Sequence, residues 1–260
     1  MAAFFKALAD GTRLAIVRLL ALTDLRAGEL VERVHAPQNA VSYHLRQLRS
    51  LGLLRDRRSG WDARDVYYSL DLERLHELYA AAGNSLHPGI ACTPGTAPAP
   101  SEATVPLRVL FLCTHNSARS QLAEAIARQI GGERVEVYSA GSKPAGVHPL
   151  TVELMGEWGM DPSGHTSKPM DRFAGQRFHY AITVCDRVRE GCPVFPGDTR
   201  RIHWSLPDPL SVQNEEERRE VFCRVRQELL TRIRYLLSLP HPRTGERMWT
   251  HIADGPGDAK

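Results

Sequence analysis

The residues best placed to do chemistry form one short run, CTHNSARS, from Cys113 to Ser120. The apolar residues 109–112 before it are typical of a strand, and residues 121–128 after it are typical of a helix. A thiol and Arg119, with five residues between them, therefore lie on a strand-to-helix turn. Such a turn directs backbone N–H groups at one point, and the helix start adds positive partial charge. The run predicts a site for a tetrahedral oxyanion.

Each residue of this loop has an expected role. Arg119 can donate two parallel hydrogen bonds to an oxyanion. The same positive field favours thiolate over thiol, so Cys113 is predicted to be a nucleophile at neutral pH. A cysteine at a strand end can instead be a small core residue, but here the arginine, the serine and the helix register accompany it. The remaining oxyanion-binding residues are predicted to be Thr114, His115, Asn116, Ser117, Ala118 and Ser120.

Two further thiols and one acid could join this chemistry. Cys185 ends an expected strand, and Cys192 follows in a polar loop that we expect to be mobile. Asp208 lies between two prolines, where a rigidly held carboxylic acid could protonate a leaving oxygen, or where an aspartate could simply form a turn. Cys223 is expected to pack within the last helix, and Cys92 has no assigned role.

Strands and helices alternate around these residues. Strands are expected at 134–138, 179–184 and 201–204, with helices at 149–158 and 214–238. The last helix has an apolar stripe made of Val221, Val225, Leu229, Ile233 and Leu236. This alternation predicts an α/β fold, a doubly wound parallel sheet with helices on both sides and its site at the carboxyl ends of the strands.

The first third of the chain has a different, mainly helical pattern. Residues 4–22 are expected to form an amphipathic helix, followed by a helix at 27–34 and, after Pro37, a third helix to about residue 51. A hairpin follows at 53–70. The buried face of the first helix is expected to contain Phe5, Leu8, Leu14, Val17 and Leu20. Two helices joined by a tight turn and followed by a hairpin predict a winged helix-turn-helix.

The third helix and the hairpin present polar and basic groups. Six arginines and one acid lie between Arg33 and Arg58, although the whole chain has a net charge of only +3. Side chains at helical spacing can reach base edges or phosphates, and hairpin arginines can contact the DNA backbone. The predicted DNA-binding residues are Gln38, Asn39, Ser42, Tyr43, Arg46, Arg57 and Arg58.

Composition sets the domain organisation. The 260 residues, 42% hydrophobic and 24% charged, fit two globular domains. We expect a winged helix at 1–83, a Pro/Ala/Gly-rich linker at 84–106, an α/β domain at 107–239 and a polar tail at 240–260. No run is long enough to span a membrane, and five cysteines do not suggest a secreted disulfide framework. A cytoplasmic protein with no membrane contact is expected.

Residues 1–82 resemble winged-helix repressors of the ArsR type. The resemblance rests on FKALADGTR at 5–13, VSYHL at 41–45 and the Tyr67-Tyr68 pair. It implies binding to double-stranded operator DNA as a homodimer, paired through the first helix and residues 72–82. That family commonly senses metals through cysteines or histidines, but no cysteine precedes Cys92 here. His35, His44, His76 and Asp71 form no convincing ligand set, so no metal site is predicted.

Residues 107–238 resemble the low-molecular-weight tyrosine phosphatase superfamily and, within it, the thioredoxin-coupled arsenate reductases. The matching segments are the loop 113–120, SAG at 139–141 and Asp208-Pro209. Cys185, Cys192 and the pair His203-Trp204 favour the reductase. The resemblance implies catalysis by Cys113, Arg119, Cys185, Cys192 and Asp208, without a bound cofactor and with thioredoxin or a similar thiol as electron donor.

The implied reaction reduces arsenate to arsenite through a thiol-disulfide relay. Cys113 would attack arsenate, Cys185 would attack the Cys113 sulfur, and Cys192 would take over the disulfide. Two alternatives stay open. The second domain could be a plain phosphatase for phosphotyrosine or a small phosphoester, needing neither Cys185 nor Cys192. It could also be only a sensor of oxyanion or redox state for a transcriptional regulator.

Overall fold

A computed structural model describes residues 2–86 and 105–239, which fall in two compact units. The two-domain fold class is confirmed: a mainly helical unit precedes an α/β unit with a parallel sheet. Helix α5 (Leu72–Leu86) continues three residues beyond the predicted domain end at 83. Cys92, most of the expected linker and the expected tail at 240–260 lie outside the described residues.

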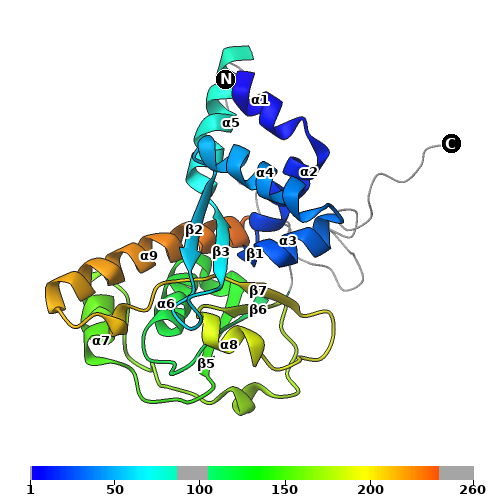
Figure 1. The fold of residues 1–260 in the computed structure, drawn as a ribbon. Helices are drawn as coiled ribbons and strands as arrows, with labels where there is room; N and C mark the ends of the chain where they lie inside the picture. The colour runs from blue at the N-terminus through cyan, green and yellow to red at the C-terminus, as the bar shows by residue number, and fades with distance from the viewer. Residues whose placement is uncertain (1, 87–104, 240–260) are drawn as a thin grey trace. The chain divides into compact units, whose positions relative to one another are not determined.

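The first unit is a winged helix (Figure 1). Its strands form an antiparallel sheet in the order β1-β3-β2, and β2 and β3 form the predicted hairpin. The other elements are α1 (Ala2–Leu8), α2 (Gly11–Leu20), β1 (Leu25–Arg26), α3 (Ala27–Val34), α4 (Gln38–Ser50), β2 (Leu54–Arg58) and β3 (Val66–Leu70). Helices α3 and α4 are joined by a short turn in which His35 adopts a left-handed conformation, with φ of 49°.

The prediction of a single helix over residues 4–22 was wrong. The helix is interrupted at Asp10. The Asp10 side chain accepts a hydrogen bond from the Arg13 backbone N–H at 2.9 Å and caps the second helix, α2. A side-chain cap starts a second helix with its own direction, so the apolar spacing does not continue across the break. Phe5 is accordingly 44% exposed, whereas Val17 and Leu20 are buried as expected.

Helix α4 divides into an apolar and a polar face. Val41, Leu45 and Leu48 are buried, which confirms the predicted inward stripe. They pack in a core that includes Ile16 from α2 and Leu30 from α3. This packing turns the opposite face of α4 to the outside of the unit.

The second unit contains a four-stranded parallel sheet in the order β5-β4-β6-β7. Helix α6 packs on β4, β5 and α9, and α9 buries its predicted apolar stripe. The elements are β4 (Leu107–Cys113), α6 (Arg119–Gly131), β5 (Val135–Gly141), α7 (Pro149–Glu157), β6 (Tyr180–Thr183), α8 (Asp186–Glu190), β7 (Arg200–His203) and α9 (Glu215–Leu237), with short 3-10 turns η2 (Gly132–Arg134), η3 (Met170–Phe173) and η4 (Pro209–Ser211).

The carboxyl ends of the strands carry the candidate residues. The inner strand β4 ends at Cys113, which is paired in register with Gly141 at the end of β5. Cys185 follows β6 after one residue and directly precedes α8. The predicted mobile loop between Cys185 and Cys192 is therefore partly helical. None of the helices within 2–86 and 105–239 is long and apolar enough to cross a membrane.

Candidate active site

The loop after β4 is tied to the segment that follows β5. Backbone N–H groups of this segment donate to loop carbonyls: Lys143 to Thr114 at 2.8 Å and Ala145 to His115 at 3.1 Å. Asn116 lies in the left-handed region, with φ of 50°. These contacts fix the loop in a tight curl between the sheet and the first turn of α6.

The loop backbone packs so closely against the end of β5 that position 141 has to be glycine. A Cβ atom at this position would lie 2.7 Å from the Thr114 carbonyl oxygen and 2.9 Å from the Asn116 nitrogen. Both neighbours are backbone atoms of the loop, so neither can move aside by a rotamer change. Glycine, which has no Cβ, lets the two backbones approach.

We expect Gly141→Ala to displace the loop and to lower the reactivity of Cys113 by an order of magnitude or more, because about 1 Å of misplacement can cost a hundredfold in rate. Iodoacetamide labelling of Cys113, followed by mass spectrometry, measures this. Gly146→Ala is not a matched control because its φ is positive, but Gly156→Ala is, since nothing lies near its added Cβ. Equal labelling of Gly141→Ala and the wild type would contradict the expectation.

The sulfur of Cys113 is buried and receives hydrogen bonds. The Asn116 backbone N–H donates to it at 3.1 Å, and the Ser120 hydroxyl lies 2.9 Å away. Burial has the largest influence and raises the pKa of the Cys113 thiol, and a charge on Cys185 would raise it further. Arg119, Ser120 and Asn116 lower that pKa. The loop groups thus favour the thiolate, as expected, but desolvation of the buried sulfur, which the sequence did not reveal, opposes them.

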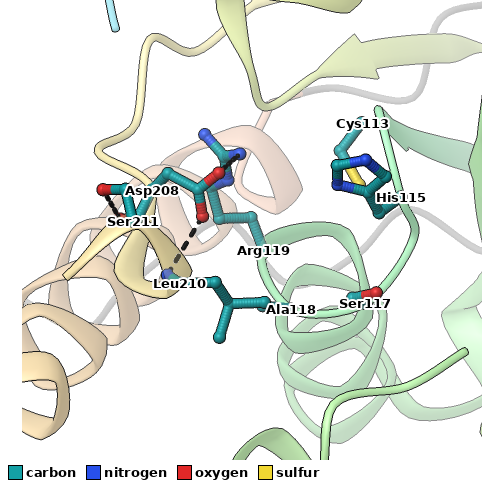
Figure 2. Close-up of a pocket in the computed structure, with 8 residues that line it drawn as sticks. All are labelled: Cys113, His115, Ser117, Ala118, Arg119, Asp208, Leu210 and Ser211. Atoms are coloured by element: carbon teal, nitrogen blue, oxygen red, sulfur yellow. Dashed lines mark hydrogen bonds and ion pairs between the residues drawn. The ribbon is translucent and has the colours of Figure 1, made fainter. Parts of the chain in front are cut away.

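A small cavity of about 180 Å³ opens beside the thiol. Figure 2 shows Arg119 between Asp208 and the side of the pocket formed by Cys113 and His115. The lining also includes Ser117 and Ala118 from the loop, together with Leu210 and Ser211. Helix α6 begins at this pocket, and its N-cap residue Ala118 supplies no side-chain cap. The first N–H groups of a helix left uncapped in this way suit an anion.

Arg119 and Asp208 are bonded to each other. Arg119 donates to the Asp208 carboxylate at 2.8 Å and to the Leu206 carbonyl at 3.0 Å. Asp208 also accepts from the Leu210 backbone N–H at 3.1 Å. Both Asp208 oxygens are thus acceptors here, as expected for a carboxylate. These bonds use two of the five N–H donors of the Arg119 guanidinium.

Cys185 is buried next to the same loop. Its sulfur lies 3.4 Å from the Thr114 hydroxyl. The following residue, Asp186, accepts a hydrogen bond from the Ser205 hydroxyl at 2.8 Å and lies 3.3 Å from His203 Nε2. The start of α8 is therefore held against the end of β7 by polar groups that are themselves buried.

The other thiols occupy different environments. Cys192 is partly buried, and burial raises the pKa of its thiol while Arg201 lowers it. Cys223 is exposed on α9, so the expectation that it packs was wrong. Cys223 is not part of the apolar stripe of α9, in which Phe222 and Val225 are buried instead.

In the winged helix, all five predicted positions on α4 are exposed: Gln38, Asn39, Ser42, Tyr43 and Arg46. Arg58 is exposed on β2, whereas Arg57 is half-buried. Ion pairs neutralise part of the basic excess, since Arg49 lies 2.5 Å from Asp56 and Arg55 lies 3.5 Å from Asp71.

His44 also has a structural place in the winged helix. It lies 3.4 Å from Arg13 and 3.8 Å from Asp10 at the start of α2. Within the part of the chain that the structure describes, no group of three or more His, Cys, Asp or Glu residues could hold a metal ion.

Three polar residues near the thiol were not predicted as site residues: Glu124, Ser139 and Lys168. Glu124 and Ser139 are buried, and they hydrogen-bond to each other at 2.5 Å. One signal was available, since an acid in the run LAEAIA of an apolar helix face is costly unless it has partners. The partners themselves come from distant segments.

Comparison with known proteins agrees with this geometry. Residues 108–241 match the family model described as "Low molecular weight phosphotyrosine protein phosphatase", and residues 10–56 match the model "Bacterial regulatory protein, arsR family". Curated relatives named arsenate reductase come from Halalkalibacterium halodurans and Bacillus subtilis, each 39% identical over 127 residues, or 48% of this chain and 91% of the relative. An arsenate reductase of Staphylococcus xylosus is 39% identical over 121 residues, or 46% of this chain and 88% of that protein.

The matched segments correspond to the two units of the fold. The arsR-family match covers α2 and the whole helix-turn-helix and reaches into β2, while the phosphatase-family match spans the parallel sheet, the Cys113 loop and α9. With more than half of its residues in the second match, the chain belongs to the low molecular weight phosphotyrosine protein phosphatase family, and it carries an arsR-type helix-turn-helix at its N-terminal end.

Proposed function

We propose that this chain reduces arsenate to arsenite with three cysteines and that its winged helix binds operator DNA. The observation that carries the reductase assignment is the placement of Cys185, whose sulfur is buried against Thr114 of the Cys113 loop. A phosphatase needs one thiol at this loop, whereas a second buried thiol beside it suits disulfide formation. The relatives named arsenate reductase support the same assignment.

The proposed reaction begins when arsenate occupies the pocket beside Arg119. The Cys113 thiolate attacks arsenic, and one oxygen leaves as water after protonation, for which Asp208 is the proposed acid. Asp208 would have to gain a proton and release Arg119 to the bound oxyanion. Arg119 and the N–H groups at the start of α6 hold the remaining oxygens.

Electron transfer occurs in the next step. Cys185, as a thiolate, attacks the Cys113 sulfur, and the sulfur–arsenic bond breaks. The electron pair of that bond stays on arsenic, which leaves as arsenite in the +3 state. Two thiols have then been oxidised to a Cys113–Cys185 disulfide, and one arsenic has gained two electrons.

Cys192 is proposed to regenerate the nucleophile. Its thiolate attacks Cys185, which frees Cys113 and leaves a Cys185–Cys192 disulfide. The five residues of α8 lie between these cysteines and contribute about 7.5 Å of helical rise. A disulfide holds its Cα atoms within about 7 Å, so we propose that α8 rearranges at this step. A dithiol reductant such as thioredoxin would then reduce the disulfide in a cytoplasmic setting.

The test is arsenate reduction by the full chain, measured as arsenite release with thioredoxin present and with thioredoxin left out. Cys185→Ser and Cys192→Ser each should stop steady turnover. Turnover that neither substitution affects would refute the relay. Loss of turnover in both, with arsenate still bound, would support it.

A phosphatase is the second candidate: the family match favours it, and the pocket contains Cys113, Arg119 and Asp208, the residues that this activity needs. This activity requires Cys113 but neither Cys185 nor Cys192. Hydrolysis of an aryl phosphate that survives removal of both cysteines, without arsenate turnover, would assign the second unit to phosphoester chemistry.

The DNA-binding proposal rests on the exposed polar face of α4. We expect sequence-specific duplex binding, as a homodimer, that weakens steeply with salt because phosphate contacts release counterions. Arg46→Ala should weaken binding by about tenfold or more, since a base or phosphate contact contributes about 1–3 kcal/mol. A gel-shift titration at several salt concentrations measures this.

Arg224→Ala removes the same charge from an exposed position on α9 and is the matched control. No duplex binding at low salt would exclude every regulatory function. Duplex binding without arsenate turnover would instead favour a regulator whose second unit senses an oxyanion or a redox state.

A further inference from the structure

A chain of buried hydrogen bonds leads from the Cys113 sulfur to an ion pair. Asn116 donates through its side-chain amide to the Ser120 hydroxyl at 2.9 Å and to the Ser139 hydroxyl at 2.8 Å. Ser139 in turn donates to the Glu124 carboxylate at 2.5 Å. The side chains of Asn116, Ser120 and Ser139 are completely buried, so these hydrogen bonds are shielded from bulk water.

The hydrogen bonds of this series can be donated in only one direction. A carboxylate only accepts, so Ser139 uses its single hydrogen on Glu124 and must accept from Asn116. The Asn116 side-chain oxygen accepts the backbone N–H of Lys168 at 2.7 Å, which places the amide NH₂ toward both hydroxyls. Ser120 therefore accepts from Asn116, and its own hydrogen is left for the Cys113 sulfur 2.9 Å away.

Lys168 acts at both ends of this arrangement. Its backbone N–H orients Asn116, and its ammonium lies 3.4 Å from the Glu124 carboxylate and donates to the Thr166 carbonyl at 2.9 Å. The Lys168 side chain is only 12% exposed and that of Glu124 only 6%. Lys168 thus contacts the carboxylate that accepts from Ser139 and is bonded through its backbone to the loop.

We propose that the Lys168–Glu124 ion pair is a positioning element for the nucleophile: it fixes the direction of the buried hydrogen bonds so that Ser120 donates to the Cys113 sulfur. Neither residue touches the pocket, whose lining residues include neither of them. Two donors on the sulfur, Ser120 O–H and Asn116 N–H, favour the thiolate and oppose the effect of burial. The inference deepens the proposed function, because that reaction starts with this thiolate.

Other charged groups lie near the two ends of this hydrogen-bond series, at Glu124 and at the Cys113 sulfur. Arg128 donates to the second Glu124 oxygen at 2.7 Å, but its side chain is half exposed, and His165 is held nearby through Gln121. At the sulfur, Arg119 favours the thiolate and a charged Cys185 opposes it. A test must therefore separate the direction of the hydrogen bonds from simple charge effects.

Two substitutions make this separation. Lys168→Met removes a positive charge, and Glu124→Gln removes a negative charge while allowing the new amide to donate to Ser139. If charge acted only through space, the pKa of Cys113 would rise in the first variant and fall in the second. If the ion pair fixes the hydrogen bonds, the pKa rises in both.

The readout is the pH dependence of iodoacetamide labelling of Cys113 in the full chain, resolved by mass spectrometry and requiring no arsenate. We expect labelling below the pKa to slow about tenfold for each unit by which the pKa rises. Lys168→Arg keeps the cation and should restore near-wild-type labelling. Glu136→Gln breaks the Arg108–Glu136 pair near the start of β5, at the opposite end of the sheet, and is the matched control.

The double variant Glu124→Gln/Lys168→Met leaves the net charge unchanged and serves if Glu124→Gln alone does not fold. A raised pKa in the double variant supports the inference. Unchanged labelling in the double variant, or opposite shifts in the two single variants, overturns it. Because labelling uses no arsenate, absence of arsenate turnover would refute the proposed function without affecting this result.

Discussion

Cys113→Ser is expected to reduce arsenate turnover by roughly 10⁴-fold or more, because removal of a catalytic nucleophile leaves only binding and electrostatic effects. A serine hydroxyl is far less ionised than a thiol at neutral pH and cannot form the disulfide that carries the electrons. The substitution is nearly isosteric in a site where Asn116 N–H and Ser120 already lie within hydrogen-bond distance. The fold should therefore be retained, as a thermal melt would show.

The matched control for this experiment is Cys223→Ser. Cys223 is the exposed thiol on α9, so the control removes one sulfur without touching the site. We expect it to retain full activity. Arsenate turnover by Cys113→Ser within tenfold of the wild type would exclude Cys113 as the nucleophile and would leave the relay without its first step.

Cys192→Ser is expected to limit each chain to a single turnover. Cys113 and Cys185 remain, so each chain should release one arsenite and then stop with a Cys113–Cys185 disulfide. Steady turnover should fall by a hundredfold or more, while the first release stays fast. Quenched-flow measurement of arsenite, followed by mass spectrometry of the trapped disulfide peptides, would test this.

Cys185→Ser provides the contrast, because it should release no arsenite even in the first turnover. The two variants therefore separate the second thiol from the third. If Cys192→Ser turned over steadily, a reductant would be attacking the buried Cys113–Cys185 disulfide directly, and the third step of the relay would be wrong.

Local patterns in the sequence predicted the elements that carry the site. The apolar run before Cys113 and the helix after it are close in sequence, and so are Cys185 and its strand, which is why β4, α6 and β6 were placed within a few residues. The stripe of α9 was also predicted correctly, because a 23-residue amphipathic helix repeats its pattern several times. At the start of the chain the same reasoning failed, since a single capping aspartate, Asp10, divides one apolar pattern into two helices.

Contacts between distant residues could not be predicted in the same way. Lys168 bonds to Asn116 across 52 residues, and nothing in either segment specifies the other. The balance of influences on the Cys113 pKa also depends on burial, which is a property of the packed unit. Sequence spacing identified the groups that favour the thiolate, but it could not weigh them against desolvation.

If the proposed relay operates, the local order of the short helix α8 depends on the redox state of the cysteines on either side of it. Reduced, α8 is held at its first residue by Ser205 and His203. In the proposed relay, formation of the Cys185–Cys192 disulfide would open α8 and expose its backbone. We then expect deuterium exchange within residues 186–190 to be faster after arsenate has been consumed than before. A reductant that recognises unfolded backbone could thus bind the oxidised protein in preference to the reduced protein.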